Sequence, residues 1–386
     1  MICAIIGREK NLAYAELESV VGSFDKINSE SVVFEYTKDT SLDIDRFGTV
    51  IKLANLHGYV NSFDELYVEL AQAILNTARS KDSSNIDFGI SLYGKNISYK
   101  TYKRLLINTK KTLAKNGVRS RFVESKNSIL NSAQIKHNKL ISTGIEVVIL
   151  FSTDKIAIAI THGVQDVDSY SKRDYGRPCR DMKVGMFPPK LAQSMLNISQ
   201  AQQDSIIYDP FCGSGIVLQE SMLHGHQVWG SDISDRMVQC SNSNIKWLQD
   251  NYQTADEAKI FMADATKIRD VPDRSYHIVT EGFLGSAQNN IPSPNQIEEL
   301  RAELSMLYLN FLKNLKTVAR TPESIVLTLP CWKQKEGLER LNIVDQIQKL
   351  GYTIKQFQSV EFDEVIYKRP NQIVGRQILS IKPKGS

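Results

Sequence analysis

Short apolar runs alternate with longer amphipathic segments in the second half of the chain. The runs predict strands at Ile206–Asp209, Gln227–Asp232, Ala258–Ala263, Tyr276–Thr280 and Ser324–Leu329. Helices are expected between them, and a closing strand pair at Lys355–Glu361 and Gln377–Lys382. This alternation predicts a doubly wound α/β fold with a mostly parallel sheet, in which ligands bind at the carboxyl ends of the strands.

Before residue 165 the apolar positions predict a mixed α/β fold in a less regular order. Strands are expected at Met1–Ile6, Ser31–Tyr36, Phe88–Tyr93, Val118–Glu124, Ile145–Phe151 and Lys155–Ile160. Helical spacing predicts helices at Leu12–Val21, Phe63–Ala78, Tyr102–Lys115 and Ser132–Leu140. The polar stretch from Gly163 to Arg180 has the composition of a linker.

Charge is distributed unevenly along the 386 residues, although the formal net charge is only +4. Residues 81–140 carry 13 Lys and Arg against 3 Asp and Glu, whereas residues 1–80 carry 7 against 12. A concentrated basic segment is expected of a surface that binds a polyanion, and a solvated helix face is the alternative. The candidate phosphate contacts are Lys100, Lys103, Arg104, Lys110, Lys111, Arg119 and Arg121.

Other bulk features limit the class of protein. The chain has no apolar run of about 18 residues, so no membrane span is expected, and its first ten residues lack the pattern of a secretion signal. The five cysteines are scattered and show no metal-ligand spacing, which predicts reduced thiols, a cytoplasmic location and no metal site.

The strongest motif is Asp209-Pro-Phe-Cys-Gly-Ser-Gly215, here named the glycine turn, between a predicted strand and a predicted helix. Gly213 and Gly215 permit a tight bend and close approach of a ligand, since no Cβ blocks the backbone. Asp232 ends the next strand, where a carboxylate can accept ribose hydroxyl protons, and Asp264 follows the strand after that, where it can meet an adenine amine. Together these residues predict a pocket for an adenosyl ligand.

The glycine turn lacks both the G-x-G-x-x-G spacing of a dinucleotide fold and the Gly-Lys-Ser/Thr of a phosphate loop. It resembles instead the first motif of class I methyltransferases that modify amino groups of nucleic acids. The resemblance implies S-adenosyl-L-methionine as the cofactor. The residues implied to bind it are Pro188, Asp209, Phe211, Gly213, Gly215, Asp232, Ile233, Asp264 and Ala265.

A second segment extends the resemblance. Arg173–Asp181 and Met186–Ala192 are similar to the segment before the catalytic domain of THUMP-containing tRNA guanine-N2 methyltransferases. This resemblance covers about residues 85–386. It implies a ferredoxin-like α/β region at 1–80, a THUMP-like RNA-binding domain at 81–165, a linker at 166–185 and a Rossmann-like methyltransferase domain at 186–386.

The sequence departs from this family at the catalytic position. Where the family has an Asp-Pro-Pro-Tyr-like tetrad after the fourth strand, this chain has Glu281-Gly282-Phe283. Glu281 retains an acceptor for an exocyclic amine, the Gly282 carbonyl can still accept, and Phe283 can stack on a base. Because glycine is more flexible than proline, poorer preorganisation is expected unless the loop compensates.

The residues predict one leading function and leave two alternatives open. The leading hypothesis is methylation of the exocyclic amine of a base in structured RNA, specifically the N2 amine of a guanosine in tRNA. The sequence does not identify a helper subunit. The alternatives are a DNA amino-methyltransferase and an RNA-binding protein whose methyltransferase half has decayed. The loop Ser286–Gln296 is expected to be a wall on the substrate side or a plain surface loop.

Overall fold

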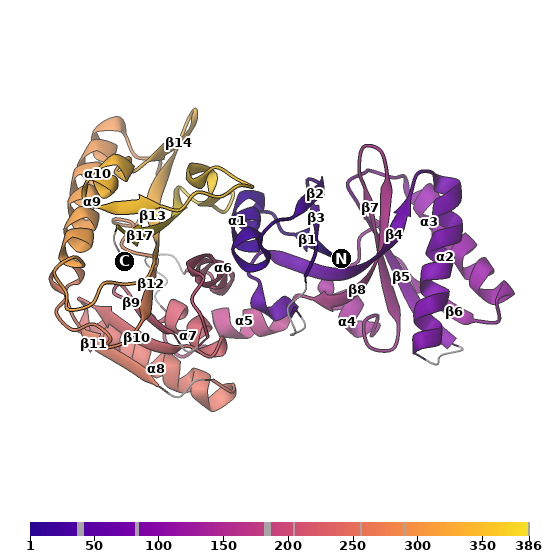
Figure 1. Ribbon diagram of the computed structural model, residues 1–386, viewed down its shortest axis with the longest axis horizontal. Coiled ribbons are helices and arrows are strands. Elements are labelled where there is room, and N and C mark those ends of the chain that lie inside the picture. The colour runs from indigo at the N-terminus through magenta and orange to yellow at the C-terminus, as the bar shows by residue number, and fades with distance from the viewer. Residues whose placement is uncertain are drawn as a thin grey trace. The chain divides into compact units, whose positions relative to one another are not determined.

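The computed structural model describes residues 1–36, 42–81, 85–180, 187–203, 205–254, 257–288 and 290–384. Asp181 and Met186 of the predicted catalytic-domain approach, and Asn289 of the loop Ser286–Gln296, lie outside these ranges. The chain forms two compact units (Figure 1). The first contains Met1–Lys10 and Val21–Asp168, and the second contains Asn11–Val20 and Ser169–Ser386.

The first unit is built on one eight-stranded sheet with the order β2-β3-β1-β4-β8-β7-β5-β6. Most neighbours are antiparallel, but β5 runs parallel to both β6 and β7. The strands are β1 (Ile2–Ile6), β2 (Asp25–Asn28), β3 (Ser31–Phe34), β4 (Val50–Val60), β5 (Asn85–Tyr93), β6 (Arg119–Val123), β7 (Ile145–Phe151) and β8 (Ile156–Val164).

Two long helices, α2 (Phe63–Ser80) and α3 (Tyr99–Lys115), cover one face of this sheet and lie side by side (Figure 1). Their apolar stripes pack on alternate residues of the strands, because side chains of a strand point to opposite faces with a period of two. Leu66 and Leu70 of α2 and Leu106 of α3 are fully buried there. The remaining helices of this unit are α4 (Ser132–His137) and the short η1 (Ile44–Arg46).

The two regions predicted on either side of residue 80 share this sheet. Strand β4 pairs with β1 on one side and with β8 on the other, where Val60 aligns with Ile156 and Asn55 with Ile160. One sheet therefore runs from the first strands to the strands of the basic segment. In the structure the first 80 residues do not form a compact unit of their own.

The second unit contains a sheet with the order β11-β10-β9-β12-β13-β17-β15. Strands from β11 to β13 are parallel, and β17 is antiparallel to β13 and β15. The strands are β9 (Ile206–Asp209), β10 (Gln227–Asp232), β11 (Ala258–Met262), β12 (Tyr276–Thr280), β13 (Ile325–Gln334), β14 (Gly337–Arg340), β15 (Tyr352–Ile354), β16 (Ile366–Tyr367) and β17 (Val374–Pro383).

Helices cover both faces of this sheet, as the alternation in sequence predicts. Ile207 of β9 packs toward α6, whereas its neighbours Ile206 and Tyr208 pack toward α9. The helices are α5 (Val167–Tyr175), α6 (Pro189–Ser199), α7 (Ile216–Leu223), α8 (Asp235–Asn251), α9 (Pro294–Asn314) and α10 (Val344–Lys349), with the short η2 (Ala265–Lys267) and η3 (Phe362–Glu364).

Helix α1 (Lys10–Val21) belongs for most of its length to the second unit. The Glu16 carboxylate accepts a hydrogen bond from Asn197 Nδ2 at 2.7 Å, and the Glu18 carboxylate accepts one from the Ser359 hydroxyl at 2.6 Å. Asn11–Val20 therefore separates from the rest of the predicted 1–80 region. The predicted linker contains helix α5.

One cysteine pair corrects the expectation of reduced thiols. Cys179 and Cys240 form a disulfide across 61 residues, while Cys3, Cys212 and Cys331 are free and buried. The spacing of Cys179 and Cys240 in sequence gives no sign of this bond, because the fold rather than a local motif brings Cys179 next to Cys240 of α8. The cysteine count therefore does not support a reducing compartment. Within the described residues, no helix is both long and apolar enough to cross a bilayer.

Candidate active site

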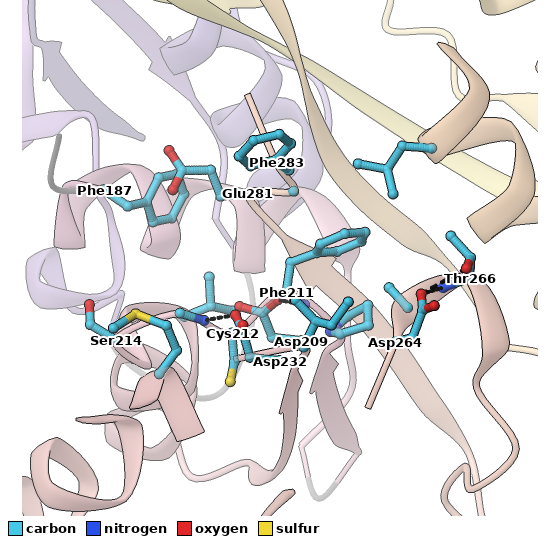
Figure 2. Close-up of a pocket in the computed structure, with 18 of the residues that line it drawn as sticks. Phe187, Asp209, Phe211, Cys212, Ser214, Asp232, Asp264, Thr266, Glu281 and Phe283 are labelled. Atoms are coloured by element: carbon cyan, nitrogen blue, oxygen red, sulfur yellow. Dashed lines mark hydrogen bonds between the residues drawn. The ribbon is translucent and has the colours of Figure 1, made fainter. Parts of the chain in front are cut away.

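A cavity of about 660 Å³ opens at the carboxyl ends of the parallel strands of the second unit (Figure 2). From β9 the chain passes to β10 and β11 on one side, whereas β12 and β13 lie on the other. Ligands of doubly wound folds bind at such a reversal of strand order. The lining comes from the glycine turn after β9, Asp232 and Ile233 after β10, Asp264–Thr266 after β11, Glu281–Phe283 after β12, and one face of α9.

The glycine turn is left-handed at two positions, with φ of +50° at Gly213 and +78° at Gly215. A Cβ at Gly215 would lie 2.3 Å from the Ser241 hydroxyl of α8, so this glycine is needed for packing against α8. Gly215 is not among the residues that line the cavity. Gly213 lines it and donates its N–H to Asp232 Oδ2 at 3.0 Å.

Two acids follow the next two strands, as expected. Asp232 accepts a second backbone hydrogen bond, from Ser234 to Oδ1 at 2.9 Å, so both of its oxygens are held and each can accept once more. Asp264 caps η2 by accepting from the Thr266 N–H at 2.9 Å and from the Thr266 hydroxyl. Its other oxygen lies 3.3 Å from Lys267 Nζ. Both carboxylates are therefore fixed by local contacts.

Asp209 is almost fully buried at the base of the cavity. It accepts hydrogen bonds from the Phe211 N–H at 3.0 Å and from the Thr280 hydroxyl. Burial raises the pKa of Asp209 to about 7, and the nearby carboxylates of Asp232 and Glu281 add to the rise. A cation placed next to this carboxyl would stabilise its ionised form.

Glu281, Gly282 and Phe283, here named the acceptor loop, line the cavity, and Glu281 and Phe283 lie at its upper side in Figure 2. Gly282 has a φ of +69°, and a Cβ there would lie 2.5 Å from the Tyr308 hydroxyl. Proline cannot occupy this position, because its ring fixes φ near −65°. The glycine that replaces the first proline of the related tetrad is thus required by the backbone of this loop.

Side chains from other elements hold the acceptor loop in place. The Tyr308 hydroxyl lies 3.0 Å from the carbonyl oxygens of Phe283 and of Thr328, and its single proton can be donated to either. The Thr328 hydroxyl donates to the Glu281 carbonyl, and the Gly282 N–H donates to the Thr280 hydroxyl at 3.2 Å. This support compensates for the flexibility that glycine alone would give.

The comparisons with known proteins found one family model that matches part of the second unit. Residues 177–334 match the family model UPF0020, described as RMKL-like, methyltransferase domain. This segment is therefore similar to a methyltransferase domain. The match covers the glycine turn, both following acids and the acceptor loop, so the resemblance seen in the sequence is confirmed for the residues around the cavity.

Curated relatives match parts of the chain. A tRNA (guanine(10)-N2)-dimethyltransferase of Methanothermobacter thermautotrophicus is 38% identical over 161 residues, which are 41% of this chain and 44% of the relative. A protein of the same name from Pyrococcus abyssi is 30% identical over 109 residues, 28% of this chain and 29% of the relative. The type II methyltransferase M.MvaI of Kocuria varians is 28% identical over 136 residues, 33% of this chain and 27% of the relative. The chain spans less than half the length of each of these relatives.

Solved structures resemble the fold of the whole chain at low identity. The crystal structure of TrmN from Thermus thermophilus has a TM-score of 0.53 at 12% identity and covers 99% of both chains. The structure of a possible methylase from Clostridium difficile 630 has a TM-score of 0.50 at 12% identity and covers 100% of this chain and 98% of the other. The predicted fold class, a Rossmann-like methyltransferase domain with an N-terminal α/β module, agrees with these neighbours.

Most of the residues predicted to bind a cofactor line the cavity of the methyltransferase domain. The exceptions are Gly215, which packs on α8, and Pro188, which is buried at the N-cap of α6. Phe187, the neighbour of Pro188, lines the cavity instead. The one-residue displacement arises because Pro188 and Pro189 begin the helix, whereas Phe187 precedes it.

Sequence reasoning missed the wall formed by α9, which contributes Glu303, Met306, Leu307 and Asn310. Met306 is 62% exposed, and such an exposed apolar side chain gives no signal in a helical pattern before the pocket is known. The described residues of the predicted Ser286–Gln296 wall do not line the cavity. Arg376, which contacts Glu281, was also missed, because it lies 95 residues away in β17.

The predicted RNA-contacting residues lie in the first unit on α3 and on the edge strand β6. Two of them are neutralised by acids: Lys103 by Glu124 at 2.5 Å and Arg121 by Asp87 at 2.5 Å. The others make no ion pair with a described residue and are exposed; they are Lys100, Arg104, Lys110, Lys111 and Arg119. These five cations remain available for phosphates.

Proposed function

We propose that this protein transfers a methyl group from S-adenosyl-L-methionine to the exocyclic N2 amine of a guanosine in tRNA. The observation that carries the proposal is the Glu281 carboxylate at the rim of an acidic cavity that also contains Asp209 and Asp232. Curated relatives named as tRNA (guanine(10)-N2)-dimethyltransferases support the choice of base and of RNA. A tRNA substrate also favours the cytoplasm as the location.

The lining of the cavity fits this cofactor. Five acidic residues and no lysine or arginine are among the described residues that line it. Such a cavity suits a ligand that carries a sulfonium and an ammonium, and the raised pKa of Asp209 marks a carboxyl that gains from a neighbouring cation. Asp232 would hold the ribose, and Asp264 with Ala265 the adenine end. When bound, the cofactor supplies an electrophilic methyl group.

The acceptor loop would orient and activate the base. The free oxygen of Glu281 can accept an N–H of the exocyclic amine, which directs the nitrogen lone pair away from the ring, and can then take up the amine proton. Burial raises the pKa of Glu281 above its ordinary value, although the neighbouring Arg376 counteracts this rise. A carboxylate whose pKa lies closer to the working pH is a better base. Phe283, which is 40% exposed, offers a ring face on which the base can stack.

The first unit would hold the RNA. We assign this role to the THUMP-like segment 81–165, with the linker at 166–185 and the catalytic domain at 186–386. Replacing Lys100 and Lys111 by Ala should weaken tRNA binding and lower the slope of log affinity against log salt by about two. The ion-paired Lys103→Ala is the matched control and should change the slope less.

The direct test is transfer of labelled methyl groups to tRNA transcripts. Wild-type protein should label tRNA, and Asp232→Ala should lose cofactor affinity in calorimetry while keeping its melting temperature within a few degrees. Absence of transfer to any cellular RNA, with cofactor binding intact, would contradict the proposal and favour an RNA-binding protein with a decayed catalytic half.

Similarity to the type II methyltransferase M.MvaI favours a second candidate, methylation of an amino group in DNA. The glycine turn allows this chemistry equally well. Competition between duplex DNA and tRNA for the labelled methyl group separates the two candidates. Label that enters DNA and not tRNA would select the second.

A further inference from the structure

A buried arginine contacts the residue at which the proposed chemistry takes place. Arg376 Nε donates to Glu281 Oε1 at 2.6 Å. The Arg376 side chain is 4% exposed, whereas the Glu281 side chain is 24% exposed and lines the cavity. Arg376 lies near the start of β17, with Pro330 of β13 on one side and Tyr367 of β16 on the other.

The two carboxylate oxygens of Glu281 have different surroundings. One oxygen is bound by the guanidinium, and no described residue donates to the other. A glutamate has three rotatable side-chain bonds, so an unsupported Glu281 would sample several positions at the rim of the cavity. The planar guanidinium restricts this freedom, because its N–H groups are fixed in direction.

The other charged or titratable groups near Glu281 do not supply a positive charge. Asp209 at the end of β9 is a second acid, and the Tyr308 hydroxyl of α9 is uncharged, since burial and Glu281 raise its pKa well above the ordinary value. Phe187, whose ring centre is 5.9 Å from the Arg376 guanidinium carbon, contributes an aromatic face. Arg376 is thus the described cation that balances this carboxylate.

We propose that Arg376 is the positioning residue of Glu281: it fixes one carboxylate oxygen and keeps the group ionised, so that the other oxygen accepts the amine of the target base. This role rests on the proposed methyl transfer, and it extends that proposal to a residue outside the lining of the cavity. It explains how a chain with Glu-Gly in place of Asp-Pro retains a preorganised acceptor.

Two substitutions of Arg376 separate charge from geometry. Arg376→Gln removes the charge, so Glu281 becomes protonated at higher pH and the single-turnover rate should fall about 100-fold at pH 7. The acidic limb of the pH–rate profile of Arg376→Gln should move to higher pH, so the loss of rate relative to wild type becomes smaller at pH 9. Arg376→Lys keeps the charge without the rigid fork and should recover about tenfold of that loss. Affinity for the cofactor should stay within about twofold in both variants.

Arg340→Gln is the matched control, because Arg340 forms ion pairs with Asp363 and Glu364 in the same unit but does not contact Glu281. It should leave the rate and its pH profile unchanged. In a Glu281→Gln background, the substitution Arg376→Gln should cost less than threefold, since the two residues act as one unit. An Arg376→Gln rate that falls equally at every pH, or that does not fall, overturns the proposal.

A readout without turnover distinguishes this proposal from the proposed function. The Glu281 carboxyl carbon, labelled with ¹³C, is titrated by NMR in wild type and in Arg376→Gln. A midpoint at least one pH unit higher in the variant supports the positioning role, even if wild type methylates nothing and the proposed function fails. Equal midpoints overturn it, even if wild type methylates tRNA.

Discussion

The glycine turn and the acceptor loop face the same cavity but are held in place by different parts of the chain. Backbone groups of the turn bind Asp232 and Asn244, which lie 19 and 30 residues further on. The acceptor loop depends on Thr328 and Arg376, which lie 47 and 95 residues from Glu281. A local strand–turn–helix motif can therefore be predicted from sequence, whereas the geometry of the loop needs the whole sheet.

The largest expected effect tests the loop. Glu281→Gln removes the acceptor charge and the base while keeping the shape of the side chain, so single-turnover methyl transfer should fall about 1,000-fold. Cofactor affinity, measured by calorimetry, should change less than about twofold, because the turn and its acids are untouched. If cofactor affinity and rate fell together, the assignment of cofactor binding to the glycine turn and of base activation to the acceptor loop would be wrong.

The disulfide tests the support of the turn. Asn244 Nδ2 donates to the carbonyls of Cys179 and of Ser214, both at 2.8 Å, so the Cys179–Cys240 link fixes the segment around Cys179 to α8, beside the turn. Closing a loop of 61 residues should contribute about 4 kcal/mol to the free energy of unfolding. Cys179→Ser should lower denaturant stability by about that amount. The buried free thiol variant Cys331→Ser serves as the control, and equal stability of wild type with and without reductant would contradict the link.

Tyr308→Phe is a smaller perturbation of the loop. It removes the hydroxyl between the carbonyls of Phe283 and Thr328 and should cost about 1–2 kcal/mol in transition-state stabilisation, or roughly tenfold in rate. Buried Tyr352→Phe, on the same face of the sheet and bonded to the Leu312 carbonyl, is the matched control for loss of a buried hydroxyl. A rate loss in the control as large as in Tyr308→Phe would show a general effect on stability.

The smallest effect concerns the turn and pH. Because the pKa of Asp209 is about 7 in the free protein, this carboxyl is largely protonated at pH 6 and ionised at pH 8. A cationic ligand favours the ionised form, so its affinity should rise about tenfold from pH 6 to pH 8, with release of a proton. Calorimetry in buffers of different ionisation enthalpy measures that proton. Asp209→Asn should remove the pH dependence of ligand affinity. An unchanged slope of log affinity against pH in this variant would contradict the assignment to Asp209.

Several elements were predicted from sequence at nearly their observed bounds because one strong pattern specifies each. Strands β9 and β12 are short, fully buried and mostly apolar, as buried parallel strands are, and β10 has an apolar centre that ends in Ser-Asp. Strand β4 was missed, although it is central to the first sheet. Its register shifts at Leu53/Ala54 and Leu56/Gly58 break the alternation that marks a strand.

Other errors have similar physical causes. The strand predicted at Lys355–Glu361 is wrong: β15 occupies Tyr352–Ile354, and the following residues form a loop whose backbone N–H groups bind Glu18. Of the candidate site, the turn and its acids were found because their spacing is local. Arg376 and Tyr308 could not be found, since a buried arginine in a strand and a tyrosine on an apolar helix face look like ordinary structural residues until the sheet order is known.

The most direct measurement of the whole account is nucleoside analysis of tRNA after incubation with the protein and labelled cofactor. Digestion and mass spectrometry should find the label in N2-methylated guanosine, at a rate that drops with Glu281→Gln and with Arg376→Gln but not with Arg340→Gln. Label in any other nucleoside, or equal labelling by wild type and Glu281→Gln, would contradict the account.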